Sequence, residues 1–255
     1  MGLNVFITGA SSGIGAAFAR EYARQGAILG LVARKRDALG ALAAECGPNT
    51  LTYSADVADG AALKAAAQDF MTRHGTTDIV IANAGISVGT LGSMEEDVAI
   101  LERVLKTNVV GLAATTQPFI AAMVARGAGS LVVIGSVAGY RGLPGSGAYC
   151  ASKSAAITWA EALRVELHGS GVRVTTICPG YIDTRMTQGN QYPMPFLLSP
   201  EKFAARAARA IAVKRRYIVI PWQMGMIGWL LNHTPRWLFD RVFAKAGRKA
   251  RNLPT

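Results

Sequence analysis

The sequence predicts a single α/β domain, built on a mostly parallel, doubly wound sheet of seven strands with helices on both faces. Short apolar runs alternate with longer stretches of helical period as far as residue 220. This alternation is typical of parallel strands joined by right-handed crossovers. The chain has 255 residues, of which 51% are hydrophobic and 17% charged, enough for one large and well-buried core.

Seven short runs are expected to form the strands, namely 3–8, 27–33, 50–54, 78–82, 130–136, 172–178 and 217–220. Helices are expected between them, including 58–74, 95–126, 146–167 and one that starts at the Ser199-Pro200 pair, with a cap and a first-turn proline. Ligands of such sheets bind at the carboxyl ends of the strands. The residues that follow the strands are therefore the candidates for a site.

Glycines mark the turn between the first strand and the first helix. Gly9, Gly13 and Gly15 stand there with the spacing G-x-x-x-G-x-G, which differs from the G-x-G-x-x-G dinucleotide fingerprint. Glycine lets backbone N–H groups approach a pyrophosphate closely, and the helix N-terminus supplies partial positive charge. The alternative is a glycine-rich turn that binds no ligand. Because this turn lies at the first crossover, between strand and helix, we favour a bound nucleotide.

The second strand ends in three basic residues, Arg34-Lys35-Arg36, without an acid. An acid at this place accepts the ribose hydroxyls of NAD, whereas an arginine accommodates the 2′-phosphate of NADP. Basic residues that simply open a surface helix are the alternative. After a glycine turn of this kind, we predict that NADP(H) is bound in preference to NAD(H).

The stretch from Ser136 to Lys153 carries the candidate chemistry. Ser136 ends a strand, and Tyr149 and Lys153 lie four residues apart on a predicted helix, so their side chains share one face. A nearby cation lowers the pKa of a phenol from about 10 toward the working pH, where proton transfer is most efficient. Taken alone, the pair also fits a solvated helix face.

Other features bound the class of protein. The N-terminus has no basic segment ahead of an apolar one, so no signal peptide is expected. No apolar run is expected to approach the length of a membrane-spanning helix, which is about 20 residues. Three cysteines without metal-binding spacing predict reduced thiols in a cytoplasmic protein, and no metal site is predicted.

Together these motifs resemble the single-domain branch of the short-chain dehydrogenase/reductase family, over residues 3–220. The resemblance rests on Thr8-Gly9-x-x-x-Gly13-x-Gly15, Asn83-Ala84-Gly85, Asn108, Ser136, Tyr149-x-x-x-Lys153 and Pro179-Gly180. Ala82 departs from the family, which often has Asn there. The resemblance implies a Rossmann-type domain, oxidoreductase chemistry on CH–OH and C=O groups with NADP(H), and a homodimer or homotetramer. The subunits would pair through the helix with Tyr149 and the 95–126 helix.

The resemblance also implies roles for residues. Tyr149 would be the general acid in carbonyl reduction, and Lys153 would lower its pKa and hold the nicotinamide ribose. Ser136 would bind the substrate oxygen, and Asn108 would hold a water in the proton relay. Asp56 and Val57 would flank the adenine, and Thr184 would contact the carboxamide. Cofactor contacts are expected from Gly9, Ser11, Ser12, Gly13, Ile14, Gly15, Arg34, Asp56, Val57, Asn83, Ala84, Gly85, Tyr149, Lys153, Pro179, Gly180, Ile182 and Thr184.

Residues 221–255 are predicted to be a basic, tryptophan-rich extension of the domain. Three of the four tryptophans lie there, and residues 214–255 carry nine Lys/Arg against one acid, so +8 of the net charge of +11 lies there. An amphipathic helix is expected from Pro235, with Leu238, Phe239, Val242 and Phe243 apolar and Arg236, Arg241 and Lys245 basic. This extension fits three roles. It would cover the substrate or contact another subunit, lie on a membrane surface, or bind an acidic protein partner.

The favoured function is NADPH-dependent reduction of a hydrophobic ketone, aldehyde or acyl thioester, in keeping with lipid metabolism. The alternatives are the same site working as an NADP-linked alcohol dehydrogenase, and a non-catalytic NADP(H)-binding scaffold or sensor. The intact set of Asn108, Ser136, Tyr149 and Lys153 weighs against a scaffold. Nucleic acid is not expected as a partner, because no recognition motif accompanies the positive charge.

Overall fold

The sheet is fully parallel, and its strands follow the order β3-β2-β1-β4-β5-β6-β7. A computed structural model describes residues 2–188, 190, 193–244, 247 and 251 of the chain. The strands are β1 (Asn4–Thr8), β2 (Ile28–Ala33), β3 (Thr50–Ser54), β4 (Ile79–Ala82), β5 (Gly129–Ile134), β6 (Val172–Pro179) and β7 (Tyr217–Ile220). Each agrees with its predicted range to within two residues at either end. The predicted doubly wound sheet is thus confirmed.

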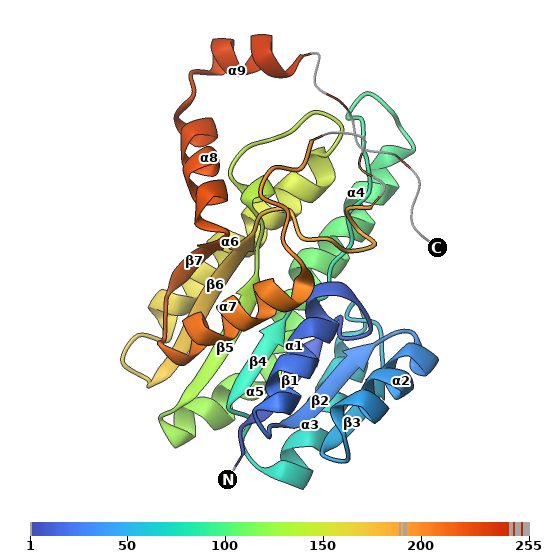
Figure 1. Ribbon diagram of the computed structural model, residues 1–255, viewed down its shortest axis with the longest axis vertical. Coiled ribbons are helices and arrows are strands. Elements are labelled where there is room, and N and C mark those ends of the chain that lie inside the picture. The colour runs from blue at the N-terminus through green and yellow to red at the C-terminus, as the bar shows by residue number, and fades with distance from the viewer. Residues whose placement is uncertain (1, 189, 191–192, 245–246, 248–250, 252–255) are drawn as a thin grey trace.

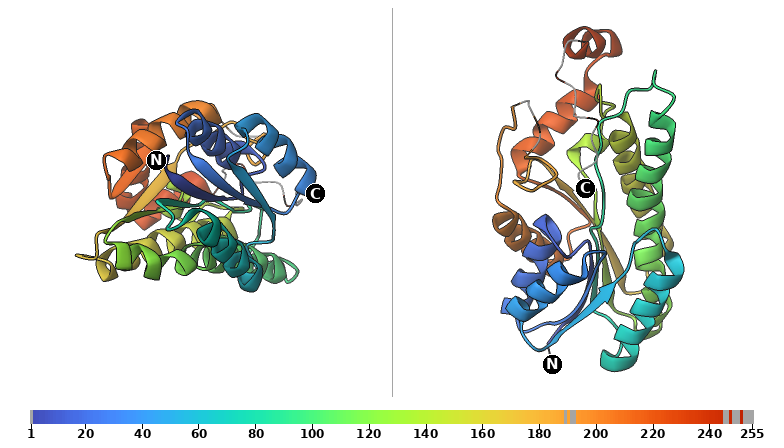
Figure 2. Two further views of the ribbon diagram at one scale, coloured as in Figure 1. Left: turned by 90° about the horizontal axis from the view of Figure 1, so that it is seen from below. Right: turned by 90° about the vertical axis from the view of Figure 1, so that its right-hand side faces the viewer.

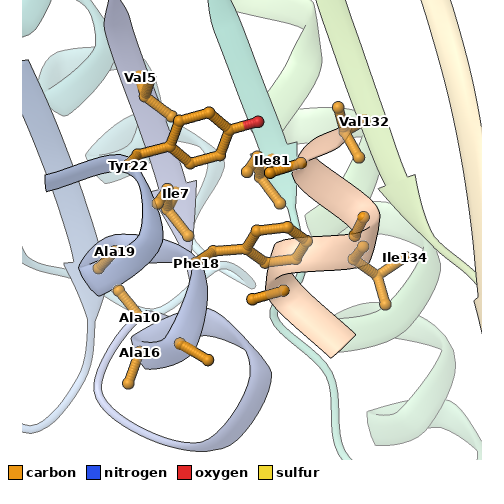
Figure 3. Packing of buried hydrophobic residues seen from close by; sticks show 14 of the residues in the cluster. Val5, Ile7, Ala10, Ala16, Phe18, Ala19, Tyr22, Ile81, Val132 and Ile134 are labelled. Atoms are coloured by element: carbon orange, nitrogen blue, oxygen red, sulfur yellow. The ribbon is translucent and has the colours of Figure 1, made fainter. Parts of the chain in front are cut away.

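Two layers of helices cover the sheet (Figures 1 and 2). One face packs against α1 (Gly13–Arg24), α2 (Arg36–Cys46) and α7 (Pro200–Ala212), and the other packs against α3 (Gly60–His74), α5 (Gly111–Arg126) and α6 (Gly147–Glu166). Figure 3 shows the first of these cores, where Phe18 and Tyr22 of α1 lie against Ile7 and Ile81 of the central strands. This burial fixes the first helix, and with it the glycine turn, on the sheet.

The predicted 95–126 helix consists of three parts, α4 (Asp97–Leu105), a π-helical turn η1 (Lys106–Val110) and α5. Over Asp97–Arg126 this run is long and apolar enough to span a membrane, with a mean hydropathy of 1.3 in its most apolar window. The expectation that no run approaches that length was therefore wrong. Leu112, Phe119 and Met123 of this run are buried in the core beneath the sheet, so it is a core helix of the α/β domain.

After β7 the chain forms two more helices, α8 (Trp222–His233) and α9 (Arg236–Phe243), which stand beyond the carboxyl ends of the strands (Figure 1). The ring of Tyr140 lies directly on Gly228, where any Cβ would collide with it. Arg141 donates to the carbonyls of Leu231 at 3.1 Å and Thr234 at 3.0 Å, and its guanidinium lies 4.4 Å from the ring centroid of Phe239. Both helices are thus anchored to the loop that joins β5 to α6.

Candidate active site

The glycine turn after β1 forms a close-fitting cradle at the start of α1. Gly9 and Gly13 adopt left-handed backbone angles, with φ of 67° and 53°, which other residues rarely adopt. A Cβ on Gly15 would collide with the carbonyl oxygen of Gly9. Ser12 stands at the N-cap, and in the described part of the chain its side chain does not cap the helix. This geometry fits a dinucleotide pyrophosphate, which needs close backbone N–H groups at a helix N-terminus.

The turn after β4 is joined to this cradle by hydrogen bonds. The side-chain amide of Asn83 donates to the carbonyls of Thr8 at 3.1 Å and Gly9 at 3.2 Å. The hydroxyl of Thr8 accepts from the backbone N–H of Asn83 at 3.3 Å. Asn83 therefore has a structural task in this turn, and it places Ala84 beside Gly9.

Arg34 and Asp56 lie together at the carboxyl ends of β2 and β3. Their side chains are 59% and 45% exposed, and Arg34 Nη1 is 3.8 Å from Asp56 Oδ2. Asp56 also accepts from the backbone N–H of Ala58 at 2.9 Å, while Val57 is buried against Gly111. The two residues predicted to meet the adenosine end of the cofactor thus share one edge of the sheet. The exposed pair is too far apart to be a strong ion pair.

Lys153 is the most unusual charged residue of the site, because its side chain is buried. Its Nζ donates to the carbonyl of Ile134 at 2.8 Å and lies 5.8 Å from the ring centroid of Tyr149. Burial lowers the pKa of Lys153 to about 8, against a smaller opposing effect of Cys178. The ammonium group therefore still carries its charge at neutral pH, next to the phenol.

Asn108 lies in the π-helical turn, and this explains why an asparagine stands inside the helical run. Its Oδ1 accepts from the N–H of Ile86 at 2.8 Å, and its Nδ2 donates to the carbonyl of Ile86 and to Ser152 Oγ, both at 2.9 Å. Ser152 Oγ in turn donates to the carbonyl of Tyr149 at 2.8 Å. Asn108 thus connects the loop after β4 with the turn of α6 that carries Tyr149 and Lys153.

Ser136 follows β5 and is 7% exposed. Its Oγ accepts from the N–H of Ala138 at 3.1 Å, and the short helix η2 (Val137–Gly139) that follows packs on α6. The catalytic residues predicted from the sequence, Asn108, Ser136, Tyr149 and Lys153, therefore come together at the carboxyl end of β5.

A hydrogen-bonded chain behind Ser136 was not predicted from the sequence. Cys178 Sγ lies 3.1 Å from the hydroxyl of Tyr217, which lies 2.7 Å from the hydroxyl of Tyr140. Burial raises the pKa of the Cys178 thiol, although hydrogen bonds from Tyr217 and from the backbone of Ser136 act in the opposite direction. Its three members, Tyr140, Cys178 and Tyr217, lie on separate segments of the sequence, so no local pattern could have revealed the hydrogen-bonded chain.

The remaining predicted cofactor contacts lie on the loop after β6. The N–H of Gly180 donates to the carbonyl of Ile220 at 2.9 Å, which holds the Pro179-Gly180 turn beneath α8. Ile182 is buried, and the methyl group of Thr184 lies 3.0 Å from the place of a Cβ on Gly13. Thr184 therefore reaches the glycine cradle. Among the residues that the structure describes, no three His, Cys, Asp or Glu side chains are grouped as metal ligands would be.

The sequence is similar to those of known proteins. The family model described as short chain dehydrogenase matches residues 3–193. An uncharacterized oxidoreductase of Myxococcus xanthus (strain DK1622) is 35% identical over 237 residues, which cover 92% of this chain and 93% of the relative.

Two solved structures are also similar. The 3-ketoacyl-(acyl-carrier-protein) reductase from Brucella melitensis, complexed with NADH, has a TM-score of 0.79 and 26% identity, covering 86% of this chain and 96% of its own. The alcohol dehydrogenase from the archaeon Thermococcus sibiricus, complexed with 5-hydroxy-NADP, has a TM-score of 0.75 and 28% identity, covering 86% and 95%.

The fold and the family match define an oxidoreductase that acts on CH–OH and C=O groups, and the two solved neighbours are complexes with NADH and with 5-hydroxy-NADP. The chain belongs to the short-chain dehydrogenase family. The family resemblance read from the motifs of the sequence is thereby confirmed.

The buried position of Lys153 predicts a pH-dependent stability. Its pKa is about 8 in the folded protein and about 10.4 in an unfolded chain, so between these values only the unfolded state keeps the proton. Stability therefore rises with pH in this window, whereas below pH 8 the full cost of burying the charge is present. Relative to Lys153→Met, the unfolding free energy of the cofactor-free wild type is expected to gain about 2 kcal/mol from pH 7 to pH 10.

Denaturant unfolding at both pH values measures this gain. The matched control is Lys64→Met, which removes an exposed lysine of α3 and should leave the difference from wild type independent of pH. A difference between wild type and Lys153→Met that is constant over this range would contradict the assignment.

Proposed function

We propose that the protein reduces the carbonyl group of a hydrophobic ketone, aldehyde or 3-oxoacyl thioester with NADPH, and that Tyr149 is the general acid. The observation that carries this proposal is the buried Lys153 ammonium, 2.8 Å from the Ile134 carbonyl and 5.8 Å from the Tyr149 ring centroid. A phenol beside a buried cation is suited to release a proton near neutral pH. A non-catalytic scaffold would have no need of this arrangement.

Each residue of the site has a defined task in this proposal. NADP(H), when bound, supplies the hydride that adds to the carbonyl carbon. Tyr149 gives its phenolic proton to the carbonyl oxygen, and Lys153 stabilises the phenolate that remains. Ser136 Oγ already accepts from Ala138, so its own proton can be donated to the substrate oxygen.

The proton taken from Tyr149 must be replaced, and Asn108 is placed to help. Both N–H groups of its amide are used, by Ile86 and Ser152, and among the described residues Oδ1 has one bonded partner, the N–H of Ile86. An amide oxygen has two lone pairs. A relay water would therefore be held through the second lone pair of Oδ1, beside the turn of α6 that carries Tyr149.

The exposed Arg34 supports a preference for NADPH over NADH. It lies at the carboxyl end of β2, where the cofactor ribose binds in sheets of this type, and its contact with Asp56 at 3.8 Å is weak. A 2′-phosphate would offer Arg34 a stronger, charge-assisted partner. Arg34 would then bind the phosphate while Asp56 remains near the adenine.

A hydrophobic substrate is supported by the loop after β6. Met186, Phe196 and Leu197 of this loop are between 36% and 49% exposed, and they follow Thr184, which reaches the cradle. Gly189, Gln191 and Tyr192 of the same loop lie outside the described residues. The same site can run in the oxidative direction as an alcohol dehydrogenase. The cellular ratio of the cofactor forms decides between the two directions.

We also propose that the chain forms a homodimer or homotetramer through the outer faces of α5 and α6. Val124 of α5 and Val165 of α6 are 40% and 62% exposed, and Val110, which ends the π-helical turn before α5, is 58% exposed. Pairing of two copies would cover these side chains and would rigidify α6, which carries Tyr149 and Lys153.

Replacing Tyr149 by Phe is expected to reduce turnover by about 10²- to 10⁴-fold, because the ring stays while the proton donor is lost. NADPH oxidation with a panel of carbonyl compounds graded by chain length measures turnover, and quenching of protein fluorescence measures NADPH affinity, which should change little. The control is Tyr53→Phe, which removes a hydroxyl of β3 that is hydrogen-bonded to Asp69 of α3. Turnover of Tyr149→Phe within tenfold of wild type would refute the acid assignment.

Replacing Arg34 by Ala is expected to narrow the preference for NADPH over NADH by about 10- to 150-fold, the loss expected for a charge-assisted contact to phosphate. The ratio of kcat/KM for the two cofactors measures it, and the value for NADH should change little. Arg173→Ala, which removes an equal charge from the exposed amino end of β6, is the control. Equal use of both cofactors by the wild type would show that Arg34 does not select for the phosphate.

A further inference from the structure

Seven large apolar side chains of α8 and α9 lie on the surface, and we define this set as the tail face: Trp222, Met226, Trp229, Leu230, Trp237, Leu238 and Val242. Its three tryptophans are 65%, 64% and 68% exposed. The opposite sides of the two helices are packed, because Met224, Gly228 and Phe239 are buried. The helices are therefore fixed in place, and their exposed apolar side chains are available to a partner.

The α8 part of the tail face is an uncharged aromatic stripe. Trp222, Met226 and Trp229 are spaced four and three residues apart, so they share one side of the helix. The helix contains no Lys, Arg, Asp or Glu, and its one titratable residue, His233, lies against Trp229 with 4.4 Å between the ring centroids. A partner on this side must therefore accept large apolar rings without any help from charge pairing.

Positive charge borders the tail face at α9. Arg236 and Arg241 are exposed on either side of Trp237 in the sequence, and neither forms an ion pair within the described residues. Residues 235–255 carry six Lys/Arg and one acid, Asp240. By contrast, the basic run 214–216 precedes β7, at the opposite end of the sheet. Of the described residues, Arg236 and Arg241 of α9 thus supply the positive charge of the tail face, whereas Arg251 is paired with Glu96 and Asp97.

We propose that the tail face docks on the surface of an anionic lipid bilayer. Tryptophan side chains lie favourably at the level of the lipid headgroups, and a helix with an apolar side and basic residues binds in the plane of that interface. Arginines beside the face would contact the anionic headgroups. The uncharged stripe on α8 and the basic border on α9 are both used by this one partner.

Two other occupants fit less well. In a symmetric contact with a second copy, the same patch faces itself, so the arginines of α9 would meet their own equivalents. An acidic protein would pair with Arg236 and Arg241, but it would find no charge along α8.

Docking would orient the site toward the lipid. Both helices stand beyond the carboxyl ends of the strands (Figure 1, and Figure 2, right), the same end at which the glycine cradle and Lys153 lie. Arg141 links them to the loop that joins Ser136 to Tyr149. This inference goes beyond the proposed reaction. Vesicle binding needs neither cofactor nor substrate, so a failure to bind vesicles would leave the proposed function untouched. Likewise, a failure to reduce carbonyl compounds would leave the proposed membrane docking untouched.

Co-sedimentation of the full-length protein with vesicles tests the proposal. Vesicles of phosphatidylserine and phosphatidylcholine are compared with vesicles of phosphatidylcholine alone, at low and at high salt. We expect binding to the anionic vesicles at low salt, and a steep loss of binding as salt rises. Trp229→Ser/Trp237→Ser should weaken binding at least tenfold. Leu3→Ser/Val213→Ser removes two exposed apolar side chains far from the tail face and should bind as wild type does.

A second pair of variants isolates the charge. Arg236→Glu/Arg241→Glu should weaken binding to anionic vesicles by about tenfold or more, while Arg173→Glu/Arg209→Glu changes the net charge equally on exposed residues elsewhere and should weaken it much less. All variants alter exposed side chains, and thermal melting verifies that each is folded.

Three results would overturn the proposal. One is no binding of the wild type to anionic vesicles at low salt. Another is an equal loss of binding in the tail-face variants and their controls. The third is a wild-type dimer that Trp229→Ser/Trp237→Ser dissociates while vesicle binding persists, which would assign the face to a second copy.

Discussion

The buried ammonium of Lys153 is the interaction on which the rest of the site depends. A cation removed from water is costly unless hydrogen bonds and neighbouring charges compensate, and here the carbonyl of Ile134 accepts from it at 2.8 Å. That bond ties α6 to the end of β5. Because burial lowers the pKa only to about 8, the charge survives at neutral pH, where it can act on Tyr149 one helical turn away.

The parallel sheet explains how residues far apart in the sequence come to lie near Lys153. Every strand ends at the same edge, so the glycine cradle after β1, the loop after β4 and Ser136 after β5 become neighbours. Close backbone packing then leaves little freedom. An added Cβ at Gly85 would stand 3.2 Å from Asn108 Oδ1 and 3.7 Å from Lys153 Nζ. The loop, the π-helical turn and α6 therefore fix one another.

The sequence predicted what depends on local chemistry. Strand ranges, the glycine turn and the Tyr149–Lys153 spacing follow from neighbouring residues, and the structure agrees with them. It did not predict what depends on distant contacts, such as the hydrogen bonds of Arg141 to carbonyls about 90 residues away. The apolar residues expected on one side of the last helix also differ in their surroundings. Phe239 and Phe243 stack on each other, whereas Val242 is 59% exposed. The predicted basic residue Lys245 lies outside the described residues.

We expect the Lys153 ammonium to make Tyr149 a proton donor near neutral pH. Ultraviolet titration of tyrosinate absorbance, taken as the difference between wild type and Tyr149→Phe in complex with oxidised cofactor, measures it directly. We expect one ionisation below the ordinary tyrosine pKa of about 10, and we expect it to move upward in Lys153→Met. Identical titrations of wild type and Tyr149→Phe below that pH would contradict it.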